Sequence, residues 1–184
     1  VNEIIKQSGS SITIGESGDT INIGTTGDTV NLAGSAYATA ETMTPSFQAY
    51  MNGNQTLANT TYTKMEMDTE VYDTDSKYDT SNYRFTPGTA GKYWVWGKFR
   101  MDTGTDIAAS IIAVYKNGSL ISKFTQFQTN STTRAFGQVI RLDTDDYIEL
   151  YGYQNGGSSE NVNGGAEEDQ DTGHWGAYRI TGVT

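Results

Sequence analysis

The chain has 184 residues, a mass of 20.0 kDa, a formal net charge of -10 and no cysteine. Twelve basic residues against 22 acidic ones argue against nucleic-acid binding, which depends on the release of phosphate counterions by Lys and Arg. The lack of cysteine excludes disulfides, thiolate metal sites and a cysteine nucleophile. The sequence also contains no transmembrane run, so we expect no membrane insertion.

A nonapeptide is written three times near the N-terminus, over residues 11–19, 20–28 and 29–37. Each copy places two aliphatic residues two positions apart, which puts both on one face of a short strand. Glycine and aspartate between the copies are typical of turns. A unit this short cannot bury its own apolar face, so it needs neighbouring chains. We predict a β-repeat stalk over residues 1–37, with an apolar ladder along a trimer axis: Ile12, Ile14, Ile21, Ile23, Val30 and Leu32.

Two other interpretations of this repeat stay open. The calcium-binding nonapeptide G-G-x-G-x-D-x-U-x has the same period, but the copies here lack its second glycine and carry Asp one place early. A flexible linker rich in Gly, Ser and Thr would also fit the composition, although it would not require six aliphatic residues in register.

Residues 38–45 form a connector of small residues, and a block with a different texture follows over residues 46–184. Turn residues separate eight strand-like runs in this block. The predicted strands are 47–51, 62–67, 93–101, 107–115, 120–127, 135–142, 147–153 and 175–180. Eight strands in this length predict an all-β sandwich or barrel. The run from Tyr93 to Trp96 is apolar on both faces, which is best explained if its outer face meets another subunit; an inserted loop would be the alternative cover.

Several motifs in this block resemble the C1q family. Phe85-Thr86-Pro87 followed by Gly91-Lys92-Tyr93-Trp94-Val95 is similar to the family signature, and Phe47-Gln48-Ala49 to its opening strand. Lys116-Asn117-Gly118, Leu142 to Leu150 and Trp175 to Ile180 follow in the family's order. The positions that carry the resemblance are Phe47, Phe85, Pro87, Gly91, Tyr93, Val95, Asn117, Gly118, Leu142, Ile148, Leu150, Trp175 and Ile180.

The resemblance implies a C1q/TNF-like jelly-roll sandwich that assembles as a homotrimer. It also implies that both ends of the block lie at one end of the sandwich, with the segment before the last strand at the other end. The collagen-like triplets that precede the head in C1q itself are absent, and the nonapeptide repeat stands in their place.

The longest stretch without a strand pattern is 155–173, which we expect to be a loop at the free tip. Its polar side chains are candidates for receptor binding: Glu160, Asn161, Asn163, Glu167, Glu168, Asp169 and Asp171. The acidic residues among them could instead hold calcium, and a solvated variable loop is a third possibility. No other cofactor is indicated.

Catalytic patterns are weak. His174, the single histidine, has no nucleophile motif beside it, and Glu167 and Glu168 are adjacent rather than facing each other across a cleft. Tyr151 and Tyr153 could stack on sugar rings, although tyrosines at a spacing of two are more often ordinary strand packing. We therefore do not expect an enzyme.

The combined pattern predicts a trimeric bacteriophage fibre tip: a stalk joined to other virion proteins on its N-terminal side, and a head that attaches to a host-surface glycan or protein. Its location would be the virion, outside the host cell. Two alternatives are a virion decoration or collar protein without a ligand, and a secreted or cell-surface C1q-like adhesin. Sugar on Asn59 or Asn130 would favour the adhesin.

Overall fold

A computed structural model describes residues 43–102, 107–129, 132–169 and 171–180. The predicted stalk with its axial residues Ile12 to Leu32, and the connector apart from residues 43–45, lie outside these residues and stay predictions. No helix in the described part of the chain has the length and apolar character needed to cross a membrane.

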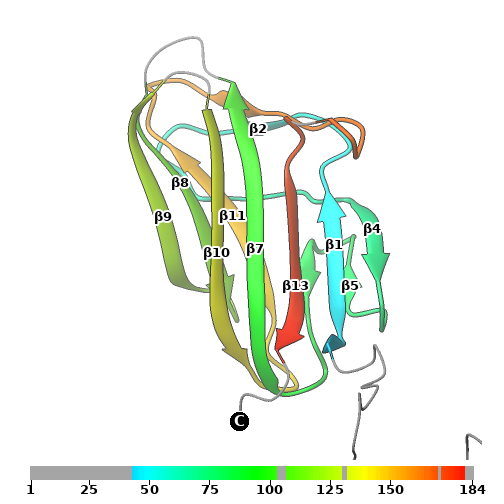
Figure 1. Cartoon of the computed structure of the whole chain (residues 1–184). Coiled ribbons are helices and arrows are strands. Elements are labelled where there is room, and N and C mark those ends of the chain that lie inside the picture. The colour runs from blue at the N-terminus through cyan, green and yellow to red at the C-terminus, as the bar shows by residue number, and fades with distance from the viewer. Residues whose placement is uncertain (1–42, 103–106, 130–131, 170, 181–184) are drawn as a thin grey trace, which may run out of the picture. The chain divides into compact units, whose positions relative to one another are not determined.

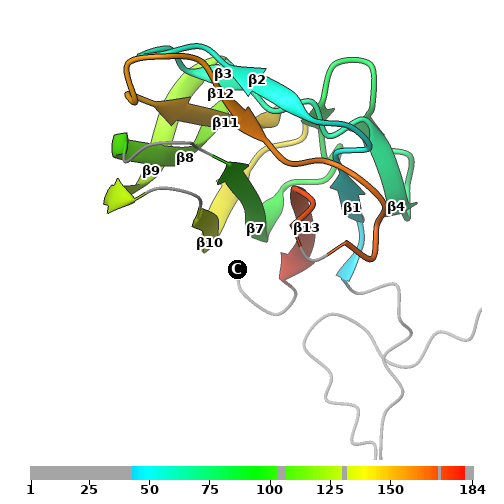
Figure 2. The same ribbon diagram turned by 90° about the horizontal axis from the view of Figure 1, so that it is seen from above.

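The described residues form two β-sheets that pack face to face (Figures 1 and 2). The seven-stranded sheet has the order β2-β12-β7-β13-β1-β4, with β10 also paired to β7. Its strands are β1 (Ser46–Tyr50), β2 (Gln55–Leu57), β4 (Thr69–Asp73), β7 (Gly91–Asp102), β10 (Thr132–Leu142), β12 (Glu160–Val162) and β13 (His174–Ile180).

The six-stranded sheet has the order β5-β6-β11-β8-β9, with β3 also paired to β11. Its strands are β3 (Thr63–Lys64), β5 (Tyr78–Asp79), β6 (Arg84–Phe85), β8 (Ile107–Lys116), β9 (Ser119–Thr129) and β11 (Ile148–Gln154). All the described pairings between strands are antiparallel. The expectation of an all-β sandwich is therefore confirmed.

All eight predicted strands have a counterpart, although the run 62–67 contributes only the two residues of β3. The sequence pattern did not indicate β2, β4, β5, β6 and β12, which have two to five residues each. A strand this short contains too few positions for the period of two to be recognised. Partner strands supply its hydrogen bonds, so its place is determined by the rest of the sheet.

An aromatic cluster lies between the two sheets. The Phe47 ring stacks on Tyr78 and on Phe85, each at 4.6 Å between centroids, and meets Trp175 edge-on at 5.0 Å. Tyr78 donates a hydrogen bond to the Met67 carbonyl at 2.7 Å, which satisfies its buried hydroxyl. Burial of this phenol raises its pKa well above the ordinary value. These contacts give a core in which aromatic rings replace much of the aliphatic packing of other sandwiches.

The positions that carry the family resemblance line this core or its turns. Phe47, Phe85, Pro87, Tyr93, Val95, Leu142, Ile148, Leu150 and Trp175 are buried, whereas Gly91 and Ile180 are half-buried. Asn117 and Gly118 have φ angles of 51° and 75° in the tight turn between β8 and β9. A left-handed conformation at both positions matches the Asn-Gly preference of such hairpins.

Candidate functional site

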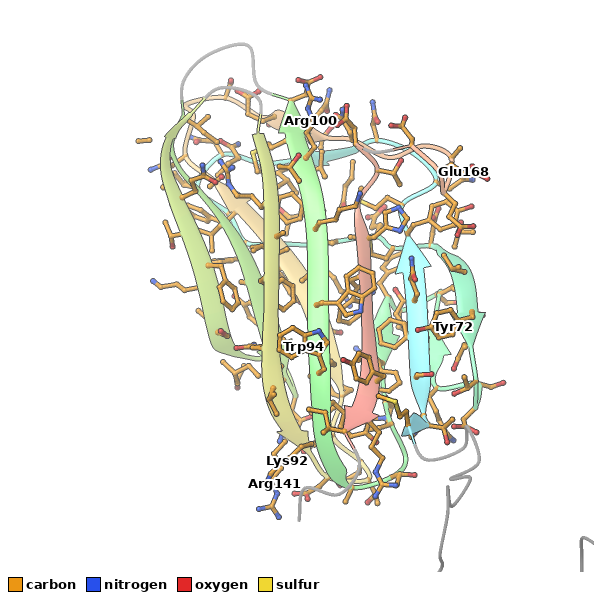
Figure 3. All side chains as sticks on the ribbon, viewed as in Figure 1. Tyr72, Lys92, Trp94, Arg100, Arg141 and Glu168 are labelled. Atoms are coloured by element: carbon orange, nitrogen blue, oxygen red, sulfur yellow. The ribbon has the colours of Figure 1, made fainter. Side chains whose placement is uncertain are left out.

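The predicted tip segment, residues 155–173, lies at one end of the sandwich. It connects β11, which ends at Gln154, to β13, which begins at His174. β1 pairs antiparallel with β13, so that Ser46 lies opposite Tyr178 while Tyr50 lies opposite His174. In Figure 3 Glu168 and Arg100 mark this end, and Lys92 and Arg141 mark the opposite one. The segment is therefore far from the start of β1 and the end of β13.

The expectation of a loop without strands in this segment was wrong in part. Glu160–Val162 form β12, which pairs with β2 on one side and with the end of β7 on the other. Beyond it, the Asn163 amide donates to the Arg100 carbonyl at 2.9 Å and the Gly165 amide to the Met51 carbonyl at 2.9 Å. The Gly173 amide closes the segment on the Asn163 carbonyl at 3.1 Å. These bonds hold the backbone on the end of the sandwich, although its composition is typical of a mobile loop.

The polar side chains of the segment do not form one surface. Glu160 is only 9% exposed and accepts a hydrogen bond from the Ser158 hydroxyl at 3.0 Å, so its proposed contact with a receptor is not supported. Asn161 is exposed, and its Oδ1 accepts from the Thr56 hydroxyl at 3.0 Å. Asn163 is half-buried. The exposed acids are Glu167, Glu168 and Asp169.

Asp171 ties the segment to β7. Its Oδ2 lies 2.6 Å from Nη1 of Arg100, and this hydrogen bond raises the pKa of the guanidinium. The Asp171 amide donates to Oδ1 of Asp169 at 3.0 Å.

Within the described part of the chain, no three acidic or histidine side chains converge in a way that could hold a metal ion. The calcium interpretation of the segment therefore has no ligand set among these residues.

His174 is packed rather than presented to a substrate. It is 5% exposed and stacks on Tyr50 at 5.7 Å between ring centroids, with Nδ1 3.4 Å from Nε2 of Gln48. Burial lowers the pKa of the imidazole, and the nearby positive charge of Lys98 lowers it further. A hydrogen bond with the Glu167 backbone acts in the opposite direction. These contacts join the tip segment to the strands beneath it and give His174 a structural role.

A second candidate surface lies on the outer face of the seven-stranded sheet. Tyr93 and Val95 of β7 are completely buried, whereas Trp94 and Trp96 alternate with them and point outward as half-buried side chains. Tyr178 of β13 and Val139 of β10 lie opposite Trp94 on either side. We call the outward side chains of Trp94, Trp96, Val139 and Tyr178 the aromatic face; Trp94 marks its centre in Figure 3.

Two glycines let the indoles lie along the sheet. A Cβ atom at Gly137 would lie 2.5 Å from Cζ2 of Trp94, and one at Gly176 would lie 3.0 Å from the ring of Trp96. Both glycines sit directly opposite Trp96 in the register of β7 with its neighbours. The sequence did not reveal this arrangement, although a glycine inside a strand is a known sign of close approach by another group.

The aromatic face is an exposed apolar surface on a sheet that is already packed on its other side. Val139 is 52% exposed, and the two indoles retain part of their surface. Contiguous apolar groups of this kind on a soluble domain are typical of a contact with another protein surface. The two apolar faces of β7 therefore have different roles: Tyr93 and Val95 face the core, whereas Trp94 and Trp96 face outward.

Comparisons with known proteins give a consistent result for the fold. No family model and no curated protein matches the sequence. Among solved structures, the globular domain of zebrafish complement 1qA protein has a TM-score of 0.51 and 13% identity, over 74% of this chain and 96% of that one. Murine APRIL at pH 8.0 has a TM-score of 0.56 and 10% identity, over 73% and 98%. The described residues of this chain therefore have the two-sheet jelly-roll fold of C1q and TNF-like domains.

Proposed function

We propose that this chain is the head and stalk of a homotrimeric bacteriophage fibre that attaches the virion to its host. The observation that carries the assembly is the aromatic face on β7, β10 and β13. In a trimer, a neighbouring copy would cover the two indoles and the half-exposed valine of this face. Rotational symmetry would bury the same face in all three protomers. C1q and TNF-like domains usually form homotrimers through jelly rolls of this kind, which supports the proposed stoichiometry.

The mass of the full chain in solution tests the assembly. The expected value is three times the 20.0 kDa chain mass at micromolar concentration, measured by light scattering after size exclusion. Trp94→Ser combined with Trp96→Ser is expected to lower this mass, because polar residues would replace the aromatic face. Leu120→Ser is the matched control, since Leu120 is 42% exposed on the other sheet. A wild-type mass of one chain would contradict the trimer.

The attachment function is supported by the place of the tip segment at the end of the sandwich. It presents Asn161, Glu167, Glu168 and Asp169 to solvent on a backbone fixed by hydrogen bonds. Weak polar contacts at three tips, repeated over several fibres, would reach useful affinity through avidity. Domains with the C1q and TNF-like fold are generally binding modules without enzymatic activity, so binding rather than chemistry is proposed.

Binding of the fluorescently labelled full chain to a panel of bacterial strains tests attachment. We expect labelling of a subset of strains, and a loss of labelling on Glu167→Ala combined with Glu168→Ala while the mass is unchanged. Asp145→Ala removes an exposed acid from the turn that follows β10 and is expected to have no effect. Labelling of no strain would favour a decoration protein of the virion over an attachment protein.

A further inference from the structure

Tyrosines gather on the outer face of the six-stranded sheet, on the side of the sandwich opposite the aromatic face. Tyr115 and Tyr151 lie 4.0 Å apart between ring centroids, and Tyr62 lies 4.9 Å from Tyr153 and 6.1 Å from Tyr115. With Tyr147, which lies under the guanidinium of Arg84, five of the 12 tyrosines in the chain are on this face. We call Tyr62, Tyr115, Tyr147, Tyr151 and Tyr153 the tyrosine platform.

The register of the strands places the platform outside the core. Along β11, Ile148 and Leu150 are buried in the core between the sheets, whereas Glu149, Tyr151 and Tyr153 alternate with them on the outer side. All five tyrosines are half-buried, so each ring keeps a surface in contact with solvent. On β8 the residues opposite Tyr151 and Tyr153 are Ala113 and Ile111, which are buried beside the tyrosine rings.

A cluster of charged side chains around the buried Glu149 holds one side of the platform. Glu149 is 3% exposed, and its Oε1 lies 3.0 Å from Nζ of Lys64 and 2.9 Å from Nη2 of Arg84. Its Oε2 accepts from the Tyr151 hydroxyl at 3.4 Å, and the Arg84 guanidinium lies 4.1 Å from the Tyr147 ring centroid. Side chains connected in this way lose little further freedom when a ligand binds, which reduces the entropic cost of binding.

We propose that the tyrosine platform binds an uncharged oligosaccharide. Tyrosine combines a rigid apolar ring with a hydroxyl, and a row of such rings can stack on sugar faces while their polar ends and the neighbouring charged groups bond to sugar hydroxyls. Charges of both signs lie beside the platform, with Lys64 and Arg84 next to Glu149 and Asp79. The chain as a whole has a charge of -10, which disfavours an acidic polysaccharide.

This inference deepens the proposed attachment function, on which it rests, by naming a ligand class and a second contact surface. The platform lies on the sheet opposite the aromatic face, so it stays accessible in a trimer that buries that face. A long host polysaccharide could then be held along the side of the head while the tip segment contacts another part of the surface.

Isothermal titration calorimetry of the full chain with maltoheptaose, cellohexaose and mannohexaose tests the proposal. We expect at least one of the three to bind. Tyr62→Ala is expected to raise its Kd by about tenfold, because one ring-stacking contact is lost. Tyr62 precedes β3 rather than lying within a strand, so this change spares the sheet. Tyr153→Phe keeps the ring and is expected to retain most of the affinity.

Tyr72→Ala is the matched control, because Tyr72 is 42% exposed on β4 of the other sheet (Figure 3) and should leave the Kd unchanged. Binding of none of the three saccharides, or equal weakening by Tyr62→Ala and Tyr72→Ala, would overturn the proposal. The assay needs no host cells. Strain labelling without saccharide binding would leave attachment standing and reject the platform, whereas saccharide binding without strain labelling would reject attachment alone.

Discussion

The contact between Trp94 and Gly137 allows a quantitative test of the aromatic face. Gly137→Ala would put a Cβ atom 2.5 Å from Cζ2 and 3.0 Å from Cη2 of Trp94. These distances are too short for carbon atoms, so one of the two groups must move. The obstacle is the edge of a half-buried side chain rather than backbone, and the indole can therefore swing away from the sheet.

The expected cost follows from two opposing contributions. Forcing an extra methyl group against a packed side chain costs about 1–3 kcal/mol. Replacing glycine by alanine where φ is negative recovers about 0.4–1 kcal/mol, because the unfolded chain has less freedom to lose. The net destabilisation is thus between about 0 and 2.6 kcal/mol, with a middle value of about 1.3 kcal/mol, and each kcal/mol lowers the Tm by roughly 2–4 °C in a chain of this size.

A double-mutant cycle with Trp94→Ala isolates this contact. We expect Gly137→Ala to destabilise the wild-type chain but to be neutral or slightly stabilising when residue 94 is alanine, because the obstacle is gone. Urea unfolding at fixed chain concentration, followed by circular dichroism, measures all four variants. Gly53→Ala is the control, since a Cβ atom there would meet nothing within 4 Å. An equal cost of Gly137→Ala in both backgrounds would refute the packing of the indole against Gly137.

Three further predictions concern the charged groups. Glu149→Gln removes the carboxylate that Lys64 and Arg84 share; we expect a loss of about 1–3 kcal/mol in urea unfolding, less than for a fully buried pair because both cations reach solvent, and no loss for Glu168→Gln. The lowered pKa of His174 means that the unfolded chain takes up a proton more readily than the native chain. The contribution of His174 to the free energy of unfolding should therefore be constant above pH 6.5, the ordinary pKa of histidine, and should fall as the pH drops below that value. His174→Gln should reduce this fall. The same pH profile in the variant as in the wild-type chain would contradict the lowered pKa of His174. Asp171→Asn should leave the global stability nearly unchanged in urea unfolding, since the pair with Arg100 is exposed to solvent, yet it should speed hydrogen exchange at the Gly165 and Gly173 amides.

Much of the sandwich could be predicted because its long strands carry their own pattern. Along β7, the run of aromatic and β-branched residues from Tyr93 to Trp96 identifies a strand, and large side chains at every position indicate that both faces are occupied. The hairpin at Asn117 and Gly118 is equally local, because its left-handed φ angles are a property of those two residues. The jelly-roll fold followed from the order of such motifs along the chain.

The short strands and the side-chain clusters could not be predicted in the same way. β12 exists because β2 and the end of β7 offer it hydrogen bonds on both sides, and nothing within Glu160–Val162 announces that. Glu160 looks like an exposed acid in the sequence but is buried once β12 is formed. Similarly, Tyr62 meets Tyr153 and Tyr115 only because the neighbouring strand β3 pairs with β11, far along the chain.

The sequence by itself thus determined the features that depend only on neighbouring residues or on composition. These are the long strands, the tight turns, the acidic character without cysteine, and the glycine-rich segment before the last strand. Only the tertiary structure decided which side chains meet. Glu149 contacts Lys64 and Arg84, and Gly137 makes room for Trp94, because antiparallel pairing brings residues that are far apart in the chain to opposite or diagonal positions on neighbouring strands. Register is a property of two strands together, so neither strand's sequence contains it alone.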